Sequence, residues 1–299
     1  MSRFPRRSRL LAAVLALPVL VTAACSASPG EDGTVQALAS FYPLQMVTQE
    51  VGGDRVTVSS LTPPGAEPHD VELSPAQVAS VGAAQLVVHQ SGFQPAVDDA
   101  VAQASPEHVV DAAVHADLAG DAEDVDDHGA DPHFWLDPTR LAAVADDVAT
   151  ALSEIDPDGA DVYRANADAL TARLTALDEA YTAGLATCER RVVVTSHEAF
   201  GYLADRYDLE LVGISGVDPE TEPSPARLRE VGDVVRDEGV TTIFFETLVS
   251  PKVAQTLAAD LGVEAAVLDP IEGLSDDTQD YFSIAEANLE ALRVALSCS

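Results

Sequence analysis

Short apolar runs rich in valine alternate with longer amphipathic stretches along most of the chain. This alternation is typical of strands that take turns with helices, and it predicts an α/β fold with parallel sheets. The runs fall into two sets of four, which indicates two lobes, each with its own sheet flanked by helices. The predicted strands are 35–41, 55–61, 85–89 and 109–112 in the first half, and 191–195, 209–214, 241–245 and 265–268 in the second.

One long helical pattern separates the two sets of strands. Apolar side chains recur at steps of three and four residues from Tyr163 to Leu185, which predicts a single buried stripe. Asp156 is a typical N-cap, and Pro157 is a typical first helical residue. We therefore expect one rigid backbone helix over 157–186 that joins the two lobes.

The N-terminal residues predict export. Four arginines precede an apolar run over 10–24, which is shorter than the roughly 20 residues that a spanning helix needs, so a signal peptide is expected. The segment before Cys25 resembles a bacterial lipobox, in which the cysteine becomes the lipidated first residue. Ordinary cleavage beside an unmodified cysteine is the alternative. The expected organisation is a signal peptide (1–24), a lipidated tether (25–33), an N-terminal lobe (34–155), a linking helix (156–187) and a C-terminal lobe (188–299).

The three cysteines are consistent with this organisation. An exported protein with three thiols leaves one unpaired unless that one has another task. If Cys25 carries lipid, Cys188 and Cys298 remain, and an oxidising compartment permits them to form a disulfide. The alternative is a pair of buried free thiols.

Charge excludes some partners. The chain has 16 basic and 50 acidic residues, and removal of the four arginines in 1–24 takes the formal net charge from −34 to about −38. Nucleic acids and anionic lipid surfaces need a basic footprint, so neither is expected as a partner. The acidity alone is explained by solubility and does not predict a metal site.

Four candidate metal ligands lie where predicted strands end or in rigid loops. His69 lies in a turn rich in proline and glycine, and His133 lies between two prolines beside the only tryptophan. His197 and Asp269 each follow a buried strand, which is the edge where parallel sheets bind ligands. A single loop histidine is commonly a surface residue. Four such residues divided evenly between two lobes favour a shared metal site.

These motifs resemble those of the ZnuA/TroA-like (cluster A-I) solute-binding proteins of zinc and manganese ABC importers. The resemblance implies a metal bound between two lobes by His69, His133, His197 and Asp269, and a permease as the partner. It extends over nearly all of the mature chain. The segments that carry it are Ala39-Ser40-Phe41-Tyr42-Pro43-Leu44, Pro68-His69-Asp70, Asp131-Pro132-His133-Phe134-Trp135, Ser196-His197-Glu198-Ala199-Phe200, Glu222-Pro223-Ser224-Pro225 and Leu268-Asp269-Pro270.

The expected donor set favours zinc. Three imidazoles and one carboxylate suit tetrahedral Zn²⁺ better than Mn²⁺, which prefers oxygen. Manganese members of the resembling family usually have a carboxylate where this chain has His197, which favours zinc. A manganese- or iron-binding homologue is the alternative. Because imidazoles must be neutral to bind, affinity should fall below about pH 6, near the usual histidine pKa of ~6.5.

Glu246, at the end of a predicted strand, is a candidate to orient one of the imidazoles. An ordinary surface glutamate is the alternative.

Zinc members of the resembling family often carry a loop rich in histidine and acids before the second ligand. Such a loop could gather Zn²⁺ weakly, whereas the simpler interpretation is a solvated acidic segment. Its counterpart here contains Glu123, Asp124, Asp126, Asp127 and His128.

An enzyme and an adhesin are the rival classes. Three histidines and a water molecule on zinc would suit a hydrolase, but Asp269 as a fourth ligand would close the site. No Ser-His-Asp arrangement, phosphate loop or HExxH pattern is evident in the sequence. An adhesin could use the same fold. We expect a monomeric binding protein, not an enzyme, anchored through Cys25 to the outer face of the cell membrane, which delivers Zn²⁺ to an ABC importer.

Overall fold

The computed structural model of the protein describes Met1, residues 33–115 and residues 131–299. Within these residues, two separate four-stranded sheets form, and all strand pairs are parallel. The first has the order β2-β1-β3-β4 and the second the order β6-β5-β7-β8, so both lobes have the same topology. The strands are β1 Val35–Ala39, β2 Val56–Ser60, β3 Leu86–His89, β4 Val109–Asp111, β5 Val192–Thr195, β6 Glu210–Gly213, β7 Thr242–Phe245 and β8 Glu264–Val267.

The α/β prediction is confirmed, and each predicted strand overlaps an observed one. Both β3 and β5 are buried along their whole length, because helices cover both faces of each sheet. A strand in that position reads as a continuous apolar run instead of an alternating one. The valine-rich sequences of β3 and β5 are therefore typical of buried strands.

Helices connect the strands, and proline marks the start of several of them. Pro75, Pro95, Pro138 and Pro225 are first helical residues, where the missing N–H costs no hydrogen bond. Within the described residues, no helix has the length and apolarity needed to cross a membrane. The helices are α1 Tyr42–Gly52, α2 Pro75–Ala83, α3 Pro95–Ala104, α4 Ala112–His115, α5 Pro138–Ile155, α6 Ala160–Gly184, α7 Gly201–Arg206, α8 Pro225–Asp237, α9 Lys252–Leu261 and α10 Tyr281–Leu296. Short 3-10 turns, η1 Gly53–Arg55, η2 Phe134–Leu136 and η3 Pro157–Gly159, complete the set.

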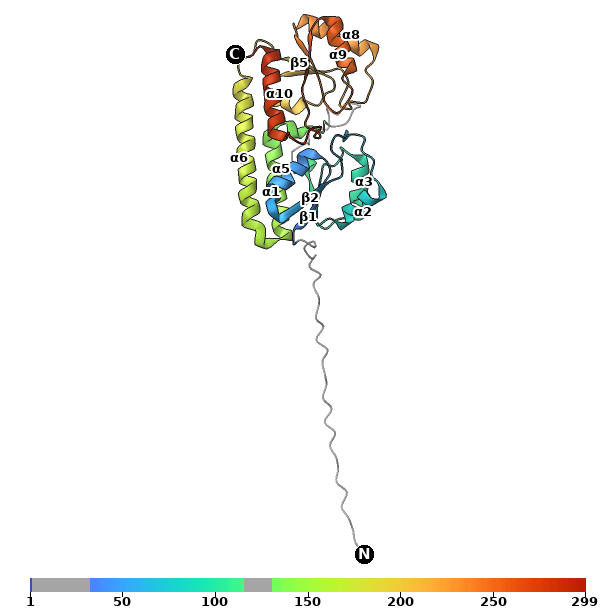
Figure 1. Ribbon diagram of the computed structural model, residues 1–299, viewed down its shortest axis with the longest axis vertical. Coiled ribbons are helices and arrows are strands. Elements are labelled where there is room, and N and C mark those ends of the chain that lie inside the picture. Colours follow the sequence, from blue (N-terminus) through green and yellow to red (C-terminus); the bar gives the residue numbers. More distant parts are fainter. Residues whose placement is uncertain (2–32, 116–130) are drawn as a thin grey trace.

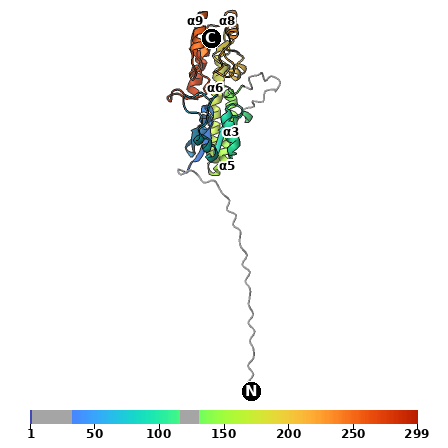
Figure 2. The same ribbon diagram turned by 90° about the vertical axis from the view of Figure 1, so that its right-hand side faces the viewer.

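The longest helix, α6, runs beside both lobes (Figures 1 and 2). Its predicted apolar stripe is buried from Tyr163 to Leu185. The start differs from the expectation, because 157–159 form the turn η3 and the Asp156 side chain does not cap a helix. The Asp156 carboxylate instead accepts hydrogen bonds from Arg55 at 2.6 Å and from the Tyr163 hydroxyl at 2.7 Å. These contacts attach the N-terminal end of α6 to the first lobe.

The two lobes share one hydrophobic core. A single cluster of buried side chains includes Phe41 and Trp135 from the first lobe, Leu174 from α6, and Phe244 and Tyr281 from the second. A hydrogen bond also joins α6 to the second lobe. The Tyr181 hydroxyl of α6 donates to the Ala285 carbonyl of α10 at 2.7 Å. A shared core and a shared helix hold the lobes in one relative position.

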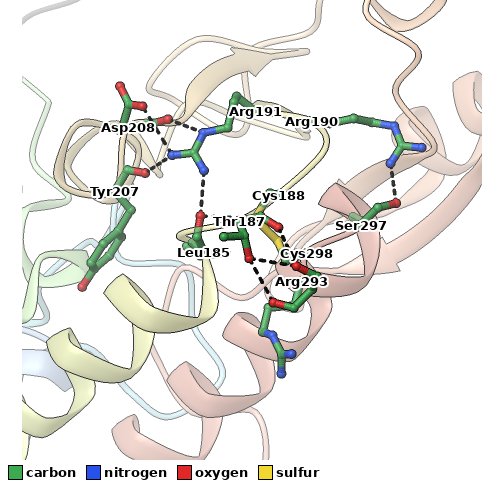
Figure 3. Close-up of a disulfide and its surroundings, with 12 residues drawn as sticks. Leu185, Thr187, Cys188, Arg190, Arg191, Tyr207, Asp208, Arg293, Ser297 and Cys298 are labelled. Carbon is green, nitrogen blue, oxygen red and sulfur yellow. Dashed lines mark hydrogen bonds and ion pairs between the residues drawn. A yellow bond between two sulfur atoms is a disulfide. The ribbon is translucent and has the colours of Figure 1, made fainter.

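The predicted disulfide is present between Cys188 and Cys298 (Figure 3). It joins the end of the α6 connection to the C-terminus, 110 residues further along the chain. Arg191 supports the same region, because its guanidinium donates to the carbonyls of Leu185 at 2.7 Å and Tyr207 at 2.5 Å. The bridge closes a loop that contains the whole second sheet.

We expect the double variant Cys188→Ala/Cys298→Ala to lose stability. A bridge that closes so long a loop restricts the unfolded chain, and its removal should lower the free energy of unfolding by about 2–4 kcal/mol. Urea unfolding of the metal-free protein measures this, with the wild type in strong reductant as the matched comparison. An unchanged unfolding midpoint in both samples would contradict the expectation.

Candidate metal centre

Three histidines lie at the carboxyl ends of strands or in the loops beside them. His69 is in the loop after β2, His197 follows the end of β5 by two residues, and His133 immediately precedes η2. A fourth side chain, Glu272, comes from the loop between β8 and α10. Residues from both lobes therefore meet at the edge of the sheets where α/β proteins bind ligands.

The four side chains converge on one point. The Nε2 atom of His133 lies 3.2 Å from that of His69 and 3.4 Å from that of His197. Glu272 Oε1 lies 3.0 Å from His133 Nε2, and one ligand atom from each of the four residues lies within 4.8 Å of the other three. Around a tetrahedral ion with metal–nitrogen distances of roughly 2.0–2.1 Å, the nitrogens are about 3.3 Å apart. The observed spacing fits one ion of that size.

The group is secluded from solvent. Side-chain exposure is 11 % for His69, 1 % for His197 and 0 % for both His133 and Glu272. A cavity of about 580 Å³ adjoins Glu272 between the N-terminal end of α1, the segment 62–65 and the segment 272–277. A cation bound by these four side chains would be buried, and its attraction to the Glu272 carboxylate would be stronger there than in water.

Two carboxylates orient two of the imidazoles. His133 Nδ1 donates to Asp131 Oδ1 at 2.7 Å, and His197 Nδ1 donates to Glu246 Oε1 at 2.8 Å. The Ser196 hydroxyl donates to the same Glu246 oxygen at 2.7 Å. A proton held on Nδ1 leaves the Nε2 lone pair free for a metal. Glu246 thus has the place suggested for it from the sequence. Asp131 was not singled out, although its position two residues before a candidate ligand was a usable signal.

The structure does not bring Asp269 into the group, contrary to the sequence prediction. Its Oδ1 accepts from the Ile271 backbone N–H at 2.8 Å, and its Oδ2 accepts from the Thr247 hydroxyl at 2.7 Å. Both carboxylate oxygens therefore build the turn that follows β8. Glu272, three residues later, supplies the carboxylate beside the imidazoles. The sequence reasoning stopped at the first acid after the strand.

The loop that carries Glu272 is fastened to the other lobe. The Trp135 indole N–H donates to the Pro270 carbonyl at 2.7 Å, and the Tyr281 hydroxyl donates to the Trp135 carbonyl at 2.6 Å. Ile271, which is buried, has a φ of 58°. A β-branched residue in the left-handed region costs on the order of 1–3 kcal/mol and persists only where its surroundings hold it. These contacts place Glu272 next to His133.

Electrostatics in the metal-free group favour a bound proton. Burial lowers the pKa of His197, but its hydrogen bond to Glu246 and its electrostatic attraction to Glu272 outweigh burial and raise the pKa to about 10. Burial also opposes the charged form of His133, yet its contacts with Asp131 and Glu272 raise its pKa. Burial raises the pKa of Glu272, but its close electrostatic contacts with the three imidazoles outweigh burial and lower the pKa well below its usual value. A positive charge is thus needed here, and a divalent cation can supply it in place of protons.

Several predicted residues lie outside the described part of the chain. Cys25 falls in 2–32, and the acidic segment with Glu123, Asp124, Asp126, Asp127 and His128 falls in 116–130. Their suggested roles stay predictions.

A comparison with protein-family models gives a match over most of the chain. A family described as "Zinc-uptake complex component A periplasmic" (ZnuA) matches residues 38–295. The chain belongs to the ZnuA family. This membership confirms the resemblance predicted from the motifs, and a component of an uptake complex agrees with a binding protein instead of an enzyme.

Relatives of known name lie within the same family. The zinc-binding lipoprotein AdcA of Streptococcus pneumoniae is 35% identical over 96% of this chain, which spans 60% of AdcA. The zinc-uptake protein ZnuA of Bacillus subtilis is 32% identical over 95% of this chain and 96% of its own length. The Zn(II)-bound ZnuA-like domain of S. pneumoniae AdcA superposes with a TM-score of 0.76 at 33% identity, covering 88% of this chain and 99% of that one. The chain thus corresponds to the ZnuA-like part of the longer AdcA proteins.

We expect Asp131→Asn and Glu246→Gln each to weaken zinc binding by about 10–100-fold, because the amide holds the Nδ1 proton of its histidine less firmly. Competition against a chelator measures the affinity. Glu198→Gln is the matched control: Glu198 follows His197 directly but contacts Arg227 at 3.2 Å. A similar loss in all three variants would show that general acidity, and not orientation, matters.

Zinc binding should release protons at pH 7. Because the pKa of His197 is about 10 in the metal-free protein, Zn²⁺ must displace a proton below that pH. The apparent affinity should therefore rise about tenfold per pH unit for each displaced proton between about pH 6 and 9, and not level off above ~6.5. Calorimetric titration in buffers of different ionisation enthalpy counts the protons. Constant affinity from pH 7 to 9 would refute this.

Proposed function

We propose that this protein captures Zn²⁺ between its two lobes, outside the cell membrane, and delivers it to the permease of an ABC importer. The observation that supports this most strongly is the convergence of four ligand atoms within 4.8 Å of one another, from two lobes. The proposed ligands are His69, His133, His197 and Glu272. The relatives are consistent with this, since AdcA is named for zinc binding and ZnuA for zinc uptake.

The donor set supports zinc over manganese. Three imidazole nitrogens and one carboxylate oxygen form a nitrogen-rich group of tetrahedral size, which zinc accepts readily. Manganese prefers carboxylate, carbonyl and water oxygen. The partners of His133 and His197 also fix the neutral tautomer that zinc requires. Iron and manganese are the less favoured cargoes.

The same donors support transport over catalysis. Catalytic zinc sites keep one position open for water, whereas four protein ligands close a tetrahedral site. The protein would therefore hold its metal without activating a water molecule. Release would require a partner that draws one or more ligands away, which is a task suited to the permease.

The N-terminus supports attachment to the membrane. Lipidation of Cys25, with 25–33 as a tether, would keep a monomeric binding protein at the outer face near its permease. AdcA is itself named a lipoprotein. The acidic segment with Glu123, Asp124, Asp126, Asp127 and His128 would attract cations weakly, since clustered negative charge raises the local cation concentration.

The assignment of the carboxylate ligand gives a direct test. Glu272→Gln should weaken zinc binding by more than about 100-fold, since losing a ligand costs more than losing an outer partner. Asp269→Asn should change it little, because asparagine can still accept from the Ile271 N–H and bond to the Thr247 hydroxyl.

Metal content after purification and competition titration would compare both variants with the wild type. Weak binding by Asp269→Asn with normal binding by Glu272→Gln would restore Asp269 as the ligand. A wild type that binds no zinc at all would refute the proposed function.

A further inference from the structure

The two ligands of the first lobe share a local arrangement. Each follows a proline, which itself follows an acid: Glu67-Pro68-His69 and Asp131-Pro132-His133. In both cases the acid accepts a hydrogen bond from the histidine backbone N–H, at 3.0 Å from Glu67 and 2.9 Å from Asp131. The N–H side of each proline–histidine peptide group is therefore held by the same means.

The carbonyl side of each peptide group is held by a glutamine. Gln94 Nε2 donates to the Pro68 carbonyl at 3.0 Å, and Gln90 Nε2 donates to the Pro132 carbonyl at 2.7 Å. Both glutamines are almost fully buried, with 2 % exposure for Gln90 and 1 % for Gln94. A buried amide that lost such a partner would incur a desolvation penalty, so these bonds are strongly retained.

Both glutamines belong to one short segment, 90–94, which connects the central strand β3 to α3. Gln94 Nε2 also donates to Thr62 Oγ1 at 3.0 Å, and the Thr62 hydroxyl donates to the Ser40 carbonyl at 2.8 Å. Phe93, between the glutamines, lies edge-on to the His69 ring with centroids 4.8 Å apart. One segment at the edge of the sheet thus contacts both ligand loops.

We propose that the 90–94 segment sets the separation of His69 and His133 before metal arrives. Gln90 and Gln94 are positioning residues, because they bond to the peptide groups that carry the ligands and are not among the four ligand residues. The inference rests on the proposed zinc-binding function and adds the part of the chain that preorganises half of the site. Preorganisation raises affinity because less ordering remains to be done when the ion binds.

The test uses Gln90→Met and Gln94→Met in the full mature protein, since methionine matches glutamine in length but donates no hydrogen bond. Each variant should lose about tenfold or more in Zn²⁺ affinity. Each should also change the visible absorption of the Co²⁺-loaded protein, because that spectrum reports ligand geometry. A purely structural role would not move this second measurement.

Asn166→Met is the matched control. Asn166 Nδ2 also donates to a backbone carbonyl of the first lobe, that of Val51, at 3.0 Å, but it joins α6 to α1 and not to a ligand loop. It should leave Zn²⁺ affinity and the Co²⁺ spectrum unchanged even if the protein melts at a lower temperature. If a methionine variant does not fold, Gln90→Asn or Gln94→Asn keeps the amide one methylene short and should show the same loss.

The outcomes separate the two proposals. If wild type binds no zinc in this titration, the proposed function fails. If wild type binds zinc and the folded Gln90 and Gln94 variants match it in affinity and in Co²⁺ spectrum, the 90–94 segment has no positioning role and the inference is overturned.

Discussion

The convergence of three imidazoles and one carboxylate from opposite lobes is the constraint on which the rest of the structure depends. Buried groups of this kind are costly unless each polar atom is paired. Here the pairing requires both lobes, since Glu272 Oε1 lies 3.0 Å from His133 Nε2 across the interface. The shared hydrophobic core and the helix α6 hold the lobes in the relative position that this contact needs.

Contacts with neighbouring residues fix the position of each ligand, in addition to its own rotamer preference. In the first lobe, an acidic side chain and a glutamine hold the peptide group before each histidine. In the second lobe, Glu246 holds the His197 ring, while a fastened and strained loop presents Glu272. The two lobes therefore reach the same result by different means: the first through repeated backbone contacts, the second through one side-chain contact and a turn.

The carboxylates in the site call for a positive charge beside them. This local requirement does not depend on the net negative charge of the whole chain. Glu272, Glu246 and Asp131 lie in or beside the imidazole group, and their contacts raise the pKa of His197 and His133. Burial, and to a smaller extent repulsion from Glu272, raises the pKa of Glu67 to about 8. The Glu67 carboxyl near the imidazoles therefore keeps its proton at neutral pH. Excess negative charge is thus limited locally, which leaves a site suited to a single divalent cation.

The strands, the long helix and the three histidine ligands could be predicted from the sequence. These depend on local patterns: valine runs in buried strands, a three-to-four periodicity in α6, and histidines placed at strand ends by proline and glycine. Which of the two acids, Asp269 or Glu272, lies beside the imidazoles could not be predicted in this way, because it depends on long-range contacts. Both acids follow β8, and the turn between them depends on Thr247, on the Trp135 bond to Pro270, and on the left-handed backbone of Ile271. The roles of Gln90, Gln94 and Asp131 likewise could not be predicted from local patterns. A polar side chain acquires such a role only from the groups that folding brings within hydrogen-bond distance.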